Sequence, residues 1–222
     1  LRISHEGDSV NFLSVTSRRN WDISPYHFDL DFGPNPGNES RIYQEQDIVS
    51  QEFRFSSNND SNVEWTAGAY FGETELDGNT DRKFIVPLPP QFGGGFAPAA
   101  TTTDYTLSEN TYAAFGQITY NGIDRTGFHV GLRLDQFEKT IDRNAVGLSG
   151  IVDPINLEND YSFASPRAGI DFELNDSSLV YVNTGLSSKP GGFSAFIDDP
   201  ERAVFEEEES WNNEIGLKKK WL

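Results

Sequence analysis

Apolar and polar side chains alternate along most of this sequence, and that alternation constrains the fold more than any other feature. The run from Ser165 to Glu173 is the clearest case. Its apolar parity is Pro166, Ala168, Ile170 and Phe172, and its polar parity is Ser165, Arg167, Gly169, Asp171 and Glu173. Successive side chains of a β-strand face opposite sides, so a period of two predicts a strand with one apolar and one polar face.

The same alternation recurs from one end of the chain to the other. We expect a strand stub at Leu1 to Ile3 and eight full strands. The full strands are Val10 to Arg19, Ile48 to Ser57, Val63 to Glu73, Tyr112 to Tyr120, Phe128 to Asp135, Ser165 to Glu173, Leu179 to Leu186 and Trp211 to Trp221. In the first of these, Leu13 and Val15 are the apolar parity, opposite Phe12. The pattern predicts an all-β chain of about eight to nine strands.

The connections between these strands alternate between short and long. Short polar turns are expected near residues 6, 59, 123 and 175, whereas Asn20 to Asp47 and Thr74 to Asp104 are rich in Pro and Gly and predict long loops. In an up-and-down antiparallel sheet, this places every short turn on one rim and every long loop on the other. That arrangement is typical of an outer-membrane β-barrel, with short periplasmic turns and long extracellular loops. The predicted fold class is therefore an antiparallel up-and-down transmembrane β-barrel segment.

A barrel in a bilayer requires lipid to cover its apolar face. We expect Val130, Leu132, Ile170 and Leu217 to face lipid, and Arg133, Arg167, Asp171 and Glu214 to face the interior. Aromatic residues expected to form an interfacial girdle near the short turns are Phe55, Trp65, Tyr120, Phe172 and Trp221. The same alternation also suits a soluble β-sandwich, or a small self-standing barrel that binds a surface or polymer without catalysis.

Composition narrows the classes of function. The chain has 17 Lys+Arg against 35 Asp+Glu, a formal charge of −18, which argues against a nucleic-acid partner. It has no Cys, so a thiolate metal site or a Cys nucleophile is excluded. No stretch approaches the apolar length of a transmembrane helix. The first residue is Leu1 and not Met, so we expect an internal segment of a longer chain.

Six short runs occur in an order and spacing that resembles the barrel of TonB-dependent outer-membrane receptors. They are Ser50-Gln51-Glu52-Phe53-Arg54-Phe55, Tyr112-Ala113-Ala114-Phe115-Gly116-Gln117, Gly131-Leu132-Arg133, Ser165-Pro166-Arg167, Gly191-Gly192-Phe193 and Trp211-Asn212-Asn213-Glu214-Ile215-Gly216-Leu217-Lys218. The resemblance implies a bacterial outer-membrane location and a 22-stranded barrel with an N-terminal plug that carries the TonB box. It also implies TonB-energised uptake of a scarce ligand, most often a ferric siderophore. Plug, TonB box and C-terminal strands are absent from residues 1–222, so we expect this chain to be part of such a receptor barrel.

Few residues suggest a catalytic or metal-binding role. His129 shares the polar parity with Arg133 and Asp135, which fits either a proton relay or the hydrogen-bonded lining of a barrel. No catalytic residue, cofactor or metal site is predicted. Two acidic clusters could bind hard cations or keep the rim soluble and bridge to lipopolysaccharide phosphates through divalent ions. They are Asp29, Asp31 and Asn35, and Asp198, Asp199, Glu201 and Glu206 to Glu209.

The strongest candidate for ligand binding is the segment Ser187 to Phe196. Its paired glycines allow a close backbone approach, and its two phenylalanines, expected to be exposed, would supply apolar area at the extracellular rim. The candidate ligand-binding residues are Lys189, Gly191, Gly192, Phe193 and Phe196. The alternative is that the segment packs on a plug or a neighbouring loop. We expect the partners to be outer-membrane lipid and lipopolysaccharide, a small-molecule ligand and, through the plug, TonB.

Overall fold

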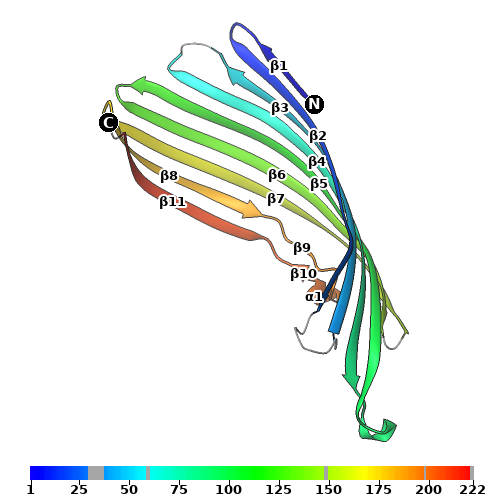
Figure 1. The fold of residues 1–222 in the computed structure, drawn as a ribbon. Helices are drawn as coiled ribbons and strands as arrows, with labels where there is room; N and C mark the ends of the chain where they lie inside the picture. Colours follow the sequence, from blue (N-terminus) through cyan, green and yellow to red (C-terminus); the bar gives the residue numbers. More distant parts are fainter. Residues whose placement is uncertain (30–37, 59–60, 148–149, 198, 221–222) are drawn as a thin grey trace.

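Nine antiparallel strands pair in chain order to form one curved sheet in this computed structural model (Figure 1). The structure describes residues 1–29, 38–58, 61–147, 150–197 and 199–220. The sheet contains β1 Arg2–Glu6, β2 Val10–Asp29, β3 Asn38–Ser57, β4 Val63–Pro87, β5 Phe96–Ile123, β6 Thr126–Gly147, β7 Gly150–Asn175, β8 Ser178–Lys189 and β11 Glu208–Lys219. A separate ribbon pairs β9 Gly192–Phe193 with β10 Val204–Phe205, and the helical turns are η1 Pro90–Phe92 and α1 Pro200–Ala203. The predicted all-β, up-and-down antiparallel fold is confirmed.

The helical content is small. In the part of the chain that the structure describes, no helix has both the length and the apolar character needed to cross a membrane.

Four short connections lie together on one rim, here called the turn rim, as the sequence predicts (Figure 1). They join β1 to β2, β3 to β4, β5 to β6 and β7 to β8. Residues 59–60 of the second connection lie outside the described ranges. The opposite rim, here called the extended rim, carries the long ends of β2 to β7.

The prediction of long loops at Asn20 to Asp47 and Thr74 to Asp104 is wrong for the described residues. β2 continues to Asp29 and β3 begins at Asn38, while β4 runs to Pro87 and β5 begins at Phe96. The backbone ladder continues beyond the apolar rows of the outer face, where polar side chains such as Asp77 and Asp104 can face water. Pro98 is tolerated because β5 pairs with β6 only from Thr102 onward, so it lies on an edge strand.

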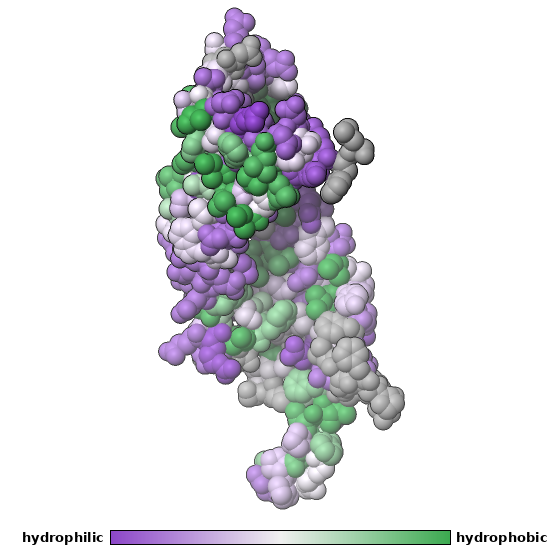
Figure 2. All heavy atoms as spheres, turned by 90° about the vertical axis from the view of Figure 1, so that its left-hand side faces the viewer, coloured by the Kyte–Doolittle hydropathy of each residue, from purple (hydrophilic) through white to green (hydrophobic). Residues whose placement is uncertain are grey.

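The register of the sheet gathers the apolar parity of the strands on one face. Ile118 of β5 lies opposite Val130 of β6, and Ile170 of β7 lies opposite Val182 of β8. Ile118 is 55% exposed and Val130 is 61% exposed, so protein does not cover this face. Figure 2 shows apolar side chains gathered in a band below a hydrophilic cap. We call this the outer face and the opposite one the inner face.

A soluble β-sandwich would bury this apolar face against a second sheet, and the described residues provide no sheet over it. They do not form a closed barrel either, because β1 and β11 are the two edges of the open sheet and do not pair with each other. The described sheet is therefore an open, curved wall with an exposed apolar outer face.

The expected aromatic girdle lies on the outer face. Register places Phe55, Trp65, Tyr120 and Phe172 on the same side of the sheet as Val130. A second group lies further along the strands, where the rings of Phe71 and Tyr112 meet edge to face with centroids 6.1 Å apart. Tyr112 and Tyr120 enclose about the nine to eleven residues that a tilted transmembrane strand needs. Trp221 lies outside the described residues.

The parity expected for β2 is wrong. Leu13 lies opposite Arg54 and Val15 opposite Glu52, so both apolar residues are on the inner face. Phe12 is on the outer face, where its ring packs against those of Phe53 and Phe55 with centroids 6.4 and 5.1 Å away. The aromatic contacts across β2 and β3 set the register, and the aliphatic pair in β2 does not.

Leu132 provides a direct test of which face meets lipid. A lysine at this outer-face position, midway between the two aromatic groups, should destabilise the folded receptor by about 2 to 4 kcal/mol. In the full-length receptor, Leu132→Cys should react with a lipid-phase thiol reagent and its neighbour Arg133→Cys with a water-soluble one. The inverse labelling pattern would show that the faces are reversed.

Several glycines on the inner face lie beneath aromatic rings from the strand beside them. Phe115 covers Gly68, Tyr105 covers Gly78 and Tyr181 covers Gly216, and each ring belongs to the residue directly opposite in the register. A Cβ at any of these glycines would overlap the ring above it. The missing side chains therefore let large rings lie flat along the inner wall.

Gly68 and Gly116 form a matched pair for testing this packing. A Cβ at Gly68 would overlap the Phe115 ring and the backbone oxygen of Phe53, whereas a Cβ at Gly116 would find its nearest atom at 3.7 Å. Gly68→Ala should lower the free energy of unfolding in detergent by about 1 to 3 kcal/mol. Gly116→Ala should leave it nearly unchanged. Equal stability of the two variants would contradict the packing described here.

Candidate functional site

Beyond the membrane-spanning part, the inner face changes from polar to apolar. The register aligns Leu76, Leu107, Ile141 and Leu157 in one row across β4 to β7. The adjacent row contains Tyr105 and Ile155. Tyr105, Ile141 and Ile155 are buried, although strands that extend beyond the membrane would be expected to contact water on both faces.

The cover for this apolar surface is the segment between β8 and β11, of which residues 190–197 and 199–207 are described. We call these residues the inward segment. Phe193 and Ala195 of this segment are buried in one cluster with Tyr105, Ile141 and Ile155. Arg143 of β6 is only 2% exposed, and its Nε donates a hydrogen bond of 2.6 Å to the Ala195 carbonyl. The ribbon of β9 and β10 and the turn α1 stabilise the segment internally, with Asp199 accepting a hydrogen bond from the backbone of Glu201. The inward segment therefore folds onto the inner wall.

The five predicted ligand-binding residues fall into three environments. Gly191, Gly192 and Phe193 are buried, so the expected exposure of Phe193 is wrong. A Cβ at Gly191 would overlap the Phe205 carbonyl oxygen and come within 2.7 Å of the Tyr161 hydroxyl, which shows that the glycine allows close packing against protein. Phe196 is 49% exposed, with its ring edge to face against Tyr105 at 5.7 Å. Lys189 is exposed at the end of β8, opposite Glu208.

Phe193 should hold the inward segment in place. Phe193→Ala removes a ring that is 8% exposed, and loss of a buried Phe side chain costs about 3 to 5 kcal/mol. Hydrogen exchange of residues 190–207 in the full-length receptor should become faster. Phe96→Ala is the matched control, because Phe96 is 76% exposed at the start of β5. Unchanged exchange in the Phe193 variant would contradict this role.

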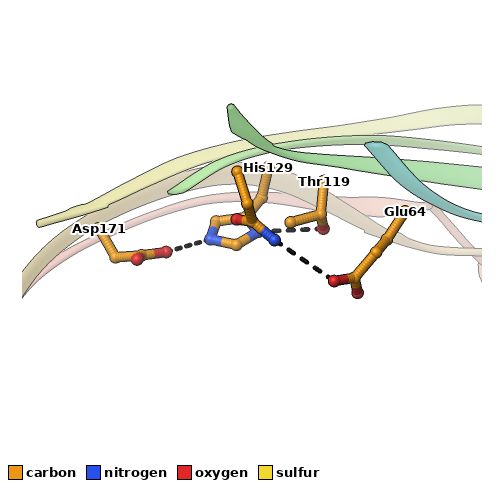
Figure 3. Close-up of polar contacts among 5 residues, drawn as sticks. Glu64, Thr119, His129 and Asp171 are labelled. Carbon is orange, nitrogen blue, oxygen red and sulfur yellow. Dashed lines mark hydrogen bonds and ion pairs between the residues drawn. The ribbon is translucent and has the colours of Figure 1, made fainter. Parts of the chain in front are cut away.

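A cluster of polar side chains lies on the inner face near the turn rim (Figure 3). His129 Nε2 is bonded to Asp171, and Thr119 Oγ1 lies 3.2 Å from His129 Nδ1. If Nε2–H donates to the carboxylate, Nδ1 accepts from the hydroxyl, and both ring nitrogens are satisfied. Beside them, Asn121 donates to Glu64 at 3.3 Å. This geometry suits the hydrogen-bonded lining of a barrel wall.

Arg133 and Asp135 form a separate group from His129. Arg133 Nε donates to the Asp135 carboxylate at 2.8 and 3.0 Å, and the guanidinium lies 5.8 Å from the ring centroids of Tyr70 and Phe115. A relay through His129, Arg133 and Asp135 is therefore not assembled by the contacts that the structure describes. Ion pairing and ring contacts hold Arg133 against the wall.

The predicted acidic clusters are only partly within the described residues. Asp31, Asn35 and Asp198 lie outside them. Within the described ranges, no three His, Asp or Glu side chains come close enough together to hold a metal ion.

Sequence reasoning missed the residues that accompany Phe196 at the extended rim. Thr80, Arg82, Thr103 and Arg143 line a cavity with it. The first two lie within a stretch assigned to a loop, and Thr103 lies near its end. The signal that could have found them is parity, because Thr101, Thr103, Tyr105 and Leu107 continue the inner-face parity of β5 outward without a break.

An antiparallel wall with an exposed apolar face, short turns on one rim and extended strands on the other is typical of an outer-membrane β-barrel. The family described as "TonB dependent receptor-like, beta-barrel" matches residues 1–222, and the chain belongs to this family. Members of this family are outer-membrane transport receptors of Gram-negative bacteria, which gives the location of the chain.

Solved structures agree on the fold. The ferric yersiniabactin uptake receptor FyuA from Yersinia pestis has a TM-score of 0.81 at 17% sequence identity, covering 98% of this chain and 32% of that one. The siderophore receptor PiuA from Acinetobacter baumannii has a TM-score of 0.73 at 13% identity, covering 100% of this chain and 37% of that one. The ferric citrate transporter FecA gives 0.62 at 13% identity, covering 97% and 31%. The chain thus spans about a third of the length of these receptors.

Proposed function

We propose that this chain forms part of the barrel wall of a receptor that imports a scarce ligand, most often a ferric siderophore in this family, with energy supplied through TonB. The remaining strands of a 22-stranded barrel, and the plug that contacts TonB, would come from the rest of the receptor. The proposed role is transport and not catalysis.

The observation that carries this proposal is the inward segment on the extracellular part of the inner wall. A wall that only enclosed a pore would not need an apolar surface above the membrane with a folded segment covering it. Phe196 remains half-exposed at the edge of that cover, beside Tyr105. An aromatic ring held by packing on one side and open on the other suits recognition of a small molecule. Lys189, Gly191, Gly192 and Phe193 would act by shaping and supporting this surface.

The three solved receptors support the same proposal through their described cargo. FyuA is an uptake receptor for ferric yersiniabactin, PiuA is a siderophore receptor and FecA is a ferric citrate transporter. All three match this chain over nearly its full length. A chelated ferric ion is therefore the first ligand to test.

We also propose that outer-membrane lipid and lipopolysaccharide surround the barrel. The apolar rows of the outer face suit acyl chains. Beyond them a groove of about 710 Å³ is lined by Asp22, Glu45, Asp77, Asp104 and Asp142, among other residues. Carboxylates at this level could approach lipopolysaccharide phosphates through divalent cations, which prefer oxygen ligands.

Phe196 gives a test of the proposed function. In the full-length receptor, Phe196→Ala should weaken binding of the cognate ferric siderophore by about 1 to 3 kcal/mol, as expected for an aromatic anchor. Phe196→Tyr keeps the ring and should retain affinity. The amount of folded receptor in the outer membrane should be equal in all three proteins, and uptake should require TonB.

Two results would contradict the proposal. One is iron uptake under limitation that is unaffected by deletion of the receptor gene, with every candidate siderophore supplied in turn. The other is unchanged affinity in Phe196→Ala at normal abundance, which would assign the inward segment to packing alone.

A further inference from the structure

A cavity of about 210 Å³ opens on the inner face near the extended rim. It lies between the ends of β4, β5 and β6, and Phe196 of the inward segment contributes one side. The register builds its wall in rows, with Thr80 opposite Thr103 and Arg82 opposite Thr101. Its lining is Thr80, Arg82, Phe84, Thr101, Thr103, Arg143, Ala145, Val146, Gly147 and Phe196.

The lining has the chemistry of an anion site. It combines two guanidinium groups with three hydroxyls, and none of the described residues that line it is Asp or Glu. Arg143 is 2% exposed, and its hydrogen bond to the Ala195 carbonyl fixes the orientation of its planar head. Arg82 is exposed. Guanidinium groups are strong donors to carboxylate and phosphate oxygens.

Thr80 provides a second and independent observation. Its side chain lines the cavity and is 4% exposed, yet its hydroxyl has no hydrogen-bond partner among the described residues. A buried polar group without a partner is destabilising, so native structures rarely keep one without a reason. A ligand oxygen in the cavity would supply the missing partner.

The surrounding charges make this lining unusual for the chain. The carboxylates of the same strand segments point to the outer face, where Asp77 accepts from Thr106 at 2.5 Å and Asp104 accepts from Asn79 at 2.6 Å. The residues that follow these acids in the sequence, Gly78 and Tyr105, point to the inner face. Arg143 of β6 lies opposite Tyr105 on that face. Strand parity thus separates Asp77 and Asp104 from this cavity.

We propose that this cavity binds an anionic oxygen group, a carboxylate or phosphate carried on a small ring, as one subsite for the transported ligand. The proposal rests on the uptake function given above and names the chemistry of the ligand. The volume supports a subsite because whole ligand pockets usually measure about 300 to 1,000 Å³. The guanidinium of Arg82 and the hydroxyl of Thr80 would bind the anion, and Phe196 would pack against the ring.

The test measures dissociation constants of small probes for the detergent-solubilised full-length receptor by ligand-observed NMR. Benzoate and phenyl phosphate should bind, and neutral benzamide should bind about tenfold more weakly or less. Arg82→Gln should weaken benzoate about tenfold or more, as expected for a charged hydrogen bond. Thr80→Val should weaken it about two- to tenfold without loss of folded protein, because the hydroxyl has no partner to lose.

Lys83→Gln is the matched control for charge. Lys83 is the next residue of β4 and lies on the opposite face, so its loss should change benzoate affinity less than twofold. Equal binding of benzamide and benzoate, or equal affinity in the Arg82 and Lys83 variants, would overturn the proposal. If these affinities behave as expected in a receptor that imports no ferric siderophore, the anion site stands and the proposed function fails.

Discussion

The backbone hydrogen-bond ladder is the interaction on which everything else in this structure depends. A strand in lipid has no water to satisfy its N–H and C=O groups, so each described strand from β1 to β8 must pair in register with its neighbours. Once the ladder is continuous, side-chain parity alone decides which residues meet lipid and which meet the interior. The ladder does not stop at the membrane surface, because β4 and β5 remain paired as far as Pro87 and Phe96. The same interaction that holds the wall together therefore also builds the extended strands that carry the proposed ligand site.

The outer and inner faces of the strands carry different kinds of side chain within the membrane and beyond it. Within the membrane, the outer face is mainly apolar, with a few polar side chains such as Thr184 and Asn213, which are bonded to each other. The inner face carries paired polar groups such as His129 with Asp171. Beyond the membrane, water covers the outer face and carboxylates can occupy it. The inner face is then free to become apolar, as it does at Leu107 and Ile141, and to hold guanidinium groups. Moving outward along one strand, the apolar residues change from the outer to the inner face without any change in the backbone.

How much of the fold and of the candidate site could be predicted from the sequence depends on where the surroundings impose a regular alternation of apolar and polar side chains. Leu132 and Ile170 lie on the face opposite Arg133 and Asp171, as predicted, because the apolar alternation around them is regular. Leu13 and Val15 were misplaced because two aliphatic residues resemble a lipid-facing parity, while the contacts of Phe12 with Phe53 and Phe55 determine the register. The segments around Thr80 and Thr103 are predicted as loops because Thr74 to Asp104 is rich in Pro and Gly, although both residues lie in strands. The burial of Phe193 depends on residues about 40 to 90 positions earlier in the chain, and no local pattern records such contacts.

The inward segment links the wall to its proposed role through two residues with different duties. Phe193 is buried among Tyr105, Ile141 and Ile155, so its contribution is to the position of the segment. Phe196, three residues later, lies half-exposed against Tyr105 and lines the cavity that contains Arg82 and Thr80. Arg143 connects the two, because it donates to the Ala195 carbonyl between them and lines the same cavity. A ligand anion that enters the cavity would thus find Arg143 and Phe196 already positioned by the folded segment, which lowers the ordering cost of binding.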